Sequence, residues 1–173
     1  RQKHKFTGCV YNSPVVMAQT VACDATVYVL EMNNSKRKIV GVGRVMNRIR
    51  PHRIKVYKDP FYNQFAYTGK YRVDRNDMTE DELRIITVLE ELIFYGSGHL
   101  QRGKGIQCIP AAIIECKGLL HALGENLVRR HVILAAKERL EIGGVDISWI
   151  KKNQDLDLIR WLNYLFDTRN FVL

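Results

Sequence analysis

Apolar and polar positions alternate along the first half of the chain, as they do in β-strands that bury one face. The stretches with a strand-like pattern are residues 7–16, 25–32, 38–46 and 61–72. Turn residues at 33–36 join the second and third stretches into a hairpin, and Thr68-Gly69 predicts another hairpin inside the fourth. The first strand ends at Asn12-Ser13-Pro14, because proline cannot donate to a strand ladder. The pattern therefore predicts a β-rich half over residues 7–78.

A helical period replaces this alternation at Thr79. Thr79 and Glu82 have the spacing of a capping box, and the apolar stripe after them predicts a helix that ends near Tyr95. The other elements expected in the helical half, residues 79–173, are a short strand before Pro110 and helices over 125–140 and 156–166. Trp161 has apolar neighbours at helical spacing, which predicts that it packs in the core.

These elements predict an α+β fold. We expect a small, strongly bent β-barrel or sheet, with a helix after the meander and the C-terminal helices packed against it. The length of 173 residues predicts a single domain over residues 1–173.

Excess positive charge is confined to the β-rich half. The formal net charge is +9, and residues 1–78 hold 15 Lys/Arg against 5 Asp/Glu, whereas residues 79–173 hold 12 against 13. Such an uneven distribution favours a polyanionic partner, because neutralising phosphates releases their condensed counterions. A basic surface that only maintains solubility is the alternative.

Seven basic residues are candidates for contact with a nucleic-acid backbone: Arg44, Arg48, Arg50, Arg53, Lys55, Arg102 and Lys104. The last two belong to the glycine loop Arg102-Gly103-Lys104-Gly105, whose open backbone N–H groups and cations suit phosphates. The glycine loop lacks the GxxxxGK[ST] spacing of a P-loop, which argues against nucleotide hydrolysis. An ordinary surface loop is the alternative interpretation.

Aromatic residues alternate with cations in the last part of the β-rich half. The rings are those of Tyr57, Phe61, Tyr62, Phe65, Tyr67 and Tyr71. Rings beside cations are typical of single-stranded nucleic-acid binding, since every base has a face on which a ring can stack. Strand alternation also turns half of such rings into a core, so we expect two or three of them to be exposed.

The sequence offers little for catalysis. The four cysteines form no CxxC pair and the histidines lie at no ligand spacing from them, so neither a metal nor another cofactor is expected. Glu90 and Glu91 are expected on a solvated helix face. An alternative function as a nucleic-acid-processing enzyme depends on His99, which precedes the glycine loop.

The spacing of the cysteines and the first residues of the chain indicate where in the cell the protein is expected. Widely spaced cysteines are typical of reduced, mostly buried thiols in an intracellular protein. The chain begins at Arg1 and not at Met, so we expect it to be trimmed, and its first residues lack the apolar stretch of a signal peptide. No apolar run reaches the roughly 18 residues of a membrane-spanning helix, so no membrane partner is expected.

Two short motifs, Tyr11-Asn12-Ser13-Pro14 and Ile39-Val40-Gly41-Val42-Gly43-Arg44-Val45, resemble the PUA-like superfamily and more narrowly its EVE and YTH domains. The resemblance extends over residues 7–110 and implies a pocket that takes up a modified or flipped base between aromatic walls. By position Asn12 and Ser13 would face that ligand, with Tyr11, Tyr62 and Trp149 as the candidate walls. Glycine leaves space where a larger side chain would not, so Gly41 and Gly43 would make room for it. The chain departs from the family in Val15–Ala22, which lacks the usual tryptophan and Asn-rich segment.

Charge and resemblance together predict a nucleic-acid-binding module. RNA is favoured over DNA, and recognition of a modified or flipped base is the finer prediction. Two alternatives remain from the sequence: the enzyme that would use His99, and a protein-interaction or assembly module whose basic face meets an acidic partner.

Overall fold

The computed structural model describes residues 8–95, 100, 105–110, 130–153 and 155–169, and the fold is α+β, as predicted. The described strands are β1 (Cys9–Ser13), β2 (Thr26–Asn33), β3 (Lys38–Met46), β4 (Phe65–Gly69) and β5 (Tyr71–Asp74). The α-helices are α1 (Glu80–Phe94), α4 (Arg130–Ile142), α5 (Ile147–Lys152) and α6 (Leu158–Asp167). Two short 3-10 helices, η1 (Pro60–Asn63) and η2 (Arg75–Asp77), stand before β4 and α1.

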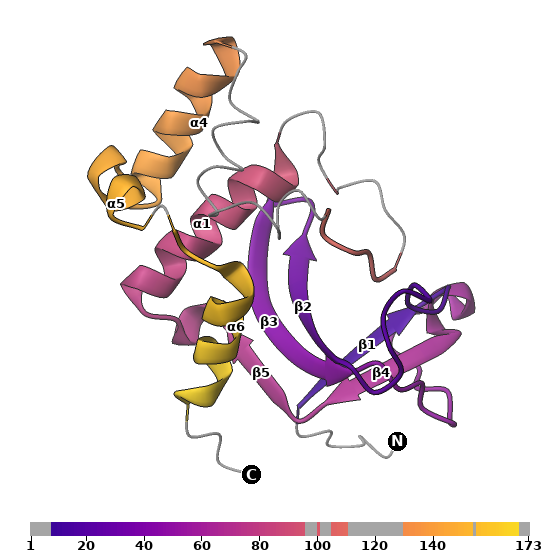
Figure 1. Cartoon of the computed structure of the whole chain (residues 1–173). Coiled ribbons are helices and arrows are strands. Elements are labelled where there is room, and N and C mark those ends of the chain that lie inside the picture. The colour runs from indigo at the N-terminus through magenta and orange to yellow at the C-terminus, as the bar shows by residue number, and fades with distance from the viewer. Residues whose placement is uncertain (1–7, 96–99, 101–104, 111–129, 154, 170–173) are drawn as a thin grey trace.

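The strands form two small antiparallel sheets (Figure 1). One sheet has the order β2-β3-β5, and the other consists of β1 and β4. The hairpin of β2 and β3 is confirmed, whereas the hairpin predicted within 61–72 is wrong, because the chain crosses at Lys70 from the β1 partner to the β3 partner. The strand predicted before Pro110 is also absent from the described residues 105–110. Figure 1 shows strong bending in β2 and β3, but the described strands form no closed barrel.

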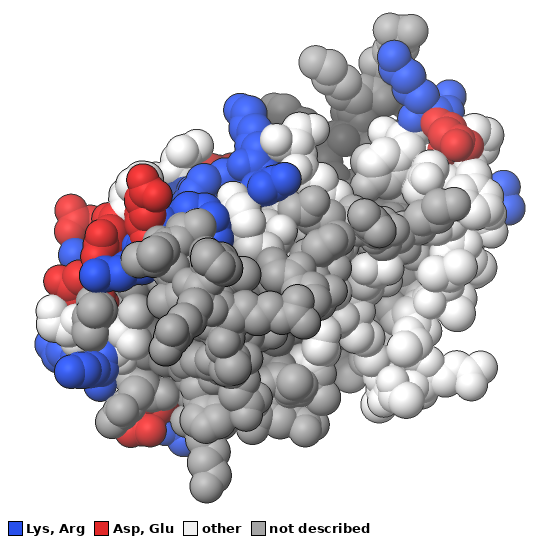
Figure 2. Space-filling model, turned by 90° about the horizontal axis from the view of Figure 1, so that it is seen from above, with Lys and Arg blue, Asp and Glu red and all other residues white. Residues whose placement is uncertain are grey.

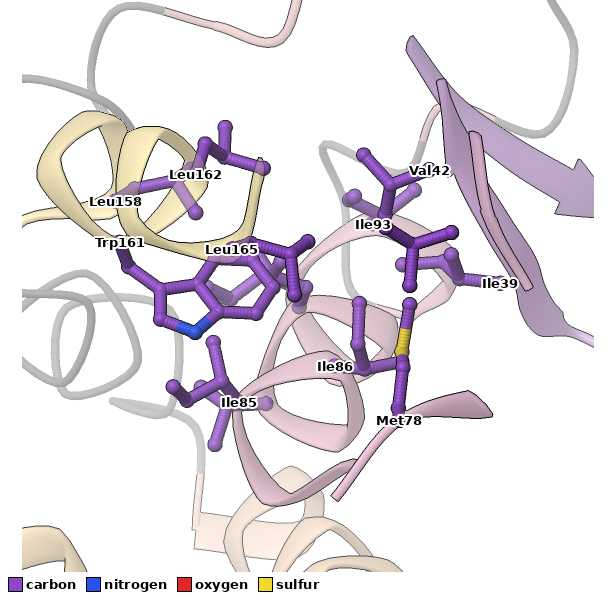
Figure 3. Packing of buried hydrophobic residues seen from close by; sticks show 14 of the residues in the cluster. Ile39, Val42, Met78, Ile85, Ile86, Ile93, Leu158, Trp161, Leu162 and Leu165 are labelled. Carbon is purple, nitrogen blue, oxygen red and sulfur yellow. The ribbon is translucent and has the colours of Figure 1, made fainter. Parts of the chain in front are cut away.

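The main core lies between the β2-β3-β5 sheet and the helices α1 and α6. Ile39 and Val42 of β3 lie in this core, and Val42 is paired with Val73 of β5. Figure 3 shows how labelled side chains from both helices, from β3 and from Met78, which lies between η2 and α1, converge on one interior: Ile39, Val42, Met78, Ile85, Ile86, Ile93, Leu158, Trp161, Leu162 and Leu165. The predicted core position of Trp161 is confirmed, since its residue is only 6% exposed.

A smaller core lies on the other face of β3, toward β1 and β4. Its buried members are Cys9, Met17, Val45 and Tyr67, and Ile106 packs against them from the segment after the glycine loop. The hydroxyl oxygen of Tyr67 accepts a hydrogen bond from the Met17 N–H, which fixes the chain just after β1. β3 therefore separates two cores that use opposite faces of the same strand.

Helix α1 begins with the predicted capping box. The Thr79 hydroxyl accepts from the Glu82 N–H, and the Glu82 carboxylate accepts from the Thr79 N–H. The expected solvated position of Glu90 and Glu91 is wrong, because both are buried. Glu90 accepts from the Ile39 N–H, from Lys38 and from Arg75, and Glu91 accepts from two nitrogens of Arg139 on α4. These acids join helix to strand and helix to helix.

The C-terminal helices pack as expected, with small differences in extent. The described part of the helix predicted over 125–140 is α4, which begins at Arg130 and continues to Ile142. The last helix, α6, begins two residues later than predicted, because Asp157 caps it by accepting from the Arg160 N–H. The short helix α5 was not predicted, and Asp146 caps it in the same way.

Candidate nucleic-acid interface

The chain between β3 and β4, residues 47–64, is the most exposed basic segment of the described structure, and we call it the basic loop. Its cations are Arg48, Arg50, Arg53, Lys55 and Lys58, and Asp59 is its one acid. Every one of these cations is solvent-exposed. In Figure 1 the loop and η1 lie beyond β4, at the side of the molecule away from α1, α4 and α5.

Two buried amides fix the basic loop. Asn63 accepts at Oδ1 from the Val56 N–H and the Tyr57 N–H, each 2.9 Å away, and donates to the carbonyl oxygens of Tyr57 and Asp59. Asn12, at the end of β1, donates from Nδ2 to Asn63 Oδ1 at 2.7 Å and to the Ile54 carbonyl oxygen at 2.6 Å. The exposed loop is thus attached to β1 by two buried side chains. We call this pair, Asn12 and Asn63, the anchor of the basic loop.

Asn12, which the resemblance predicts to face a base, therefore has a structural role in holding the basic loop. Its residue is 4% exposed, and its donor group serves the loop. Its Oδ1 atom is buried and has no hydrogen-bond partner within the described part of the chain. A buried acceptor without a donor lowers the stability of the fold. Among the described residues of the anchor, Asn12 Oδ1 is the one buried side-chain polar atom that lacks a hydrogen bond.

The basic residues predicted to meet phosphates differ in their surroundings. Arg48 forms an exposed ion pair with Asp24 at 2.6 Å, and its guanidinium lowers the pKa of that carboxyl. The Arg50 backbone N–H donates to the Ala66 carbonyl oxygen, which fastens the loop beside β4. For Arg53 and Lys55, the structure shows no ion pair with any described residue.

Arg44 has a different place, on the helix side of β3. Its guanidinium lies 4.8 Å from the Tyr71 ring centre and 5.1 Å from that of Phe166, and it pairs with Asp167 at 3.2 Å. These contacts join the end of α6 to the sheet. Arg44 is thus engaged by the protein and lies apart from the basic loop.

The aromatic residues of this region divide into exposed and buried rings. Tyr57 and Phe61 are exposed, at 47% and 48%, whereas Tyr67 is fully buried, so the expectation of two or three exposed rings is confirmed. Tyr62 lies between the exposed pair, 5.9 Å from the Tyr57 ring centre and 5.4 Å from that of Phe61, with steep interplanar angles of 63° and 86°.

The space above Gly41 and Gly43 is filled by protein side chains. A Cβ atom on Gly43 would lie 1.9 Å from the Tyr11 hydroxyl oxygen, and one on Gly41 would lie 2.7 Å from Nη2 of Arg72. The Tyr11 hydroxyl donates to Glu31, which also accepts two hydrogen bonds from Arg72. Burial, and then the bond to Glu31, raises the pKa of Tyr11 far above its usual range. The glycines therefore make room for a polar network that joins β1, β2 and β5 across β3.

Gly105, the one residue of the glycine loop that the structure describes, lies against the end of β1. Gly105 has φ +72°, and a Cβ there would lie 2.5 Å from Oγ of Ser13 and 2.7 Å from Cδ of Pro14. The predicted turn at the end of β1 and the last residue of the glycine loop are thus in contact. The other candidates of this region, His99, Arg102 and Lys104, lie outside the described residues.

The three candidate walls of a base-binding cage lie in three places. Tyr11 packs against the smaller core, and Trp149 of α5 packs against the main core. Tyr62 belongs to the ring group of the basic loop. The structure therefore does not gather these residues around one site. Asn63 was missed by sequence reasoning, although an Asn three residues after the Pro of an Asp-Pro turn is the signal that could have found it.

Among the residues that the structure describes, the helices taken together carry no comparable excess of one charge. In Figure 2, which views the molecule from above, cationic and anionic side chains lie beside one another at the side of the helices. Within the described residues no cluster of His, Cys, Asp and Glu could hold a metal ion. None of the helices described combines the length and apolar character needed to cross a bilayer.

The cysteines differ from the expectation. Cys9 is buried, and burial raises the pKa of its thiol, whereas Cys23 and Cys108 are free and exposed. The prediction of mostly buried thiols is therefore wrong for these two residues. Cys116 lies outside the described part of the chain.

Comparison of the chain with protein-family models, with curated proteins and with solved structures finds no match. The resemblance of Tyr11–Pro14 and Ile39–Val45 to the PUA-like superfamily therefore stays a prediction.

Proposed function

We propose that this protein binds nucleic acid, RNA in preference to DNA, through the basic loop. The observation that carries the proposal is an exposed segment with five cations and one acid that buried amides hold in a fixed conformation. Cations on a preformed surface neutralise phosphates without first having to order the chain, so less entropy opposes binding.

Charge reversal tests the proposal. Arg53→Glu with Lys55→Glu should weaken binding of a short oligonucleotide of any sequence. The slope of log affinity against log salt should also fall, by about one unit for each phosphate that the variant no longer neutralises. Lys151→Glu with Lys152→Glu is the matched control, since both residues are exposed cations of α5 and the two double variants change the net charge equally. Equal effects of the loop and control variants, or salt-independent binding, would contradict the proposal.

We also propose, as the finer function, that a modified or flipped base is read at the end of β1, as the PUA-like resemblance implies. On this proposal the β2-β3-β5 sheet and the β1-β4 sheet together correspond to the bent barrel of that superfamily. The unpartnered Oδ1 of Asn12 supports it, because this acceptor suits an exocyclic N–H of a base once the anchor opens.

A pair of variants separates base reading from loop anchoring. Asn12→Ala and Asn63→Ala both remove the bond between these amides, and only Asn12→Ala removes the unpartnered acceptor. Reading by Asn12 requires that Asn12→Ala alone changes the preference among bases. If both variants lower the melting temperature and neither alters base preference, Asn12 is an anchor and the finer proposal is refuted.

A further inference from the structure

We infer that the rings of Tyr57 and Phe61 form a stacking platform for unpaired bases, so that the partner of the basic loop is a single strand and not a duplex. This inference rests on the proposed nucleic-acid binding and names the class of nucleic acid. It adds contacts with unpaired bases on the exposed rings of the loop, which are separate from the buried Asn12 amide proposed to read one base.

The ring geometry supports a platform. Tyr62 contacts Tyr57 and Phe61 at steep angles, so it braces both rings without covering either one face to face. About half of each outer ring residue is exposed to solvent. An exposed aromatic face can stack on an unpaired base, whereas the bases of a duplex already stack on their neighbours.

The anchor keeps these rings in place. Asn63 accepts from the Tyr57 N–H and donates to the Tyr57 carbonyl oxygen, so both backbone groups of this residue are held by one buried side chain. The Asp59 carboxylate accepts from the Phe61 N–H and begins η1, which carries Phe61. Both rings thus project from backbone that is already ordered, which reduces the entropy lost on stacking.

The surroundings of the rings indicate which partner fits. Of the ten exposed large apolar residues that the structure describes, seven lie on the segment after β1, at the end of β3 or on the basic loop: Val15, Val16, Met46, Ile49, Val56, Tyr57 and Phe61. The other three, Ile142, Ile159 and Tyr164, lie on α4 and α6. Lys55 and Lys58 flank Val56 and Tyr57 in the chain, and both lysines are exposed. Rings between cations match a strand in which bases and phosphates alternate. An anionic membrane surface also attracts cations and apolar groups, and the experiment includes it.

The test compares three probes: a single-stranded oligonucleotide, the duplex of the same sequence, and vesicles that contain phosphatidylserine. Tyr57→Ala and Phe61→Ala should each weaken single-strand binding by about 5- to 150-fold, which corresponds to about 1–3 kcal/mol of stacking per base. Duplex binding should change little. Tyr57→Phe should retain single-strand affinity, because it keeps the ring. Tyr164→Ala is the control, since Tyr164 is an exposed tyrosine of α6, on the other side of the sheets in Figure 1.

The outcomes separate the inference from the proposed function. Suppose that charge reversal weakens binding of both the single strand and the duplex. If the ring variants keep the wild-type melting temperature and weaken binding of neither probe, or of both probes equally, the platform is refuted and the proposed nucleic-acid binding stands. If no oligonucleotide binds, both fail. The inference is also overturned, in favour of a membrane surface, if the ring variants weaken binding to the vesicles and leave binding to the oligonucleotides unchanged.

Discussion

Truncation of Asn63 should detach the basic loop from β1. Asn63→Ala removes two hydrogen bonds donated to the Tyr57 and Asp59 carbonyl oxygens, and it leaves three donors without their acceptor. A net hydrogen bond contributes about 1 kcal/mol, and an orphaned buried donor costs about 1–3 kcal/mol. The backbone donors are half-buried and can reach water, so we expect a loss of about 2–4 kcal/mol in the free energy of unfolding.

Two measurements on Asn63→Ala test this reasoning. Denaturant unfolding should give the loss of stability, and hydrogen exchange should show faster exchange at the Val56 and Tyr57 amides than in the wild type. Gln64→Ala is the matched control, since it truncates the neighbouring amide, which is exposed. The anchor does not exist as described if Asn63→Ala and Gln64→Ala have the same stability, or if the two amides keep their protection.

Three further perturbations test the core and the polar contacts. Glu90→Gln should cost about 3–5 kcal/mol in denaturant unfolding, because it leaves two cationic partners of a buried carboxylate without a counter-charge, while oligonucleotide affinity should not change. Gly43→Ala should lower the melting temperature, with a loss of about 1–3 kcal/mol, because the added Cβ meets the Tyr11 hydroxyl; equal stability would contradict the close approach. Desolvation raises the pKa of Glu82, but hydrogen bonds from Arg169 and from the capping residue Thr79 outweigh it, so the pKa lies below the ordinary 4.5. The ionised Glu82 carboxylate therefore contributes its full stabilisation of the fold above pH 4.5, and this contribution is lost as the pH falls below that value. The stability gap between the wild type and Glu82→Gln should therefore narrow under acid, and a constant gap would contradict the ion pair.

Local signals predicted local structure well. The capping box at Thr79 and the turn between β2 and β3 are determined by residues close in sequence, and both are found where they were predicted. The partner of β4 could not be predicted in this way. Thr68-Gly69 has turn chemistry, but the cross-over to β5 depends on pairing with β1, a strand more than fifty residues earlier. Strand pairing at that separation is a property of the whole fold.

The sequence identified the cations of the candidate site, but not the contacts that hold the site in place. The excess of cations predicted the basic loop, because charge is visible without coordinates. The roles of Glu90 and Asn12 were hidden, since a polar residue that pairs within the interior looks like a surface residue in the sequence. Gly43 showed that something approaches β3 closely, but sequence alone could not tell a ligand from the Tyr11 ring.

The division of the interior by β3 has a consequence for local unfolding. The helix-side core includes many buried apolar residues from α1 and α6, whereas the core shared with β1 and β4 has four among the described residues. A layer with so few buried side chains opens at a lower free energy than the global transition, while the helices and β3 remain folded. The basic loop is attached to this weaker layer, so a ligand that binds only its closed form should suppress sub-global opening and protect the amides of β1 and β4 before it affects those of α1.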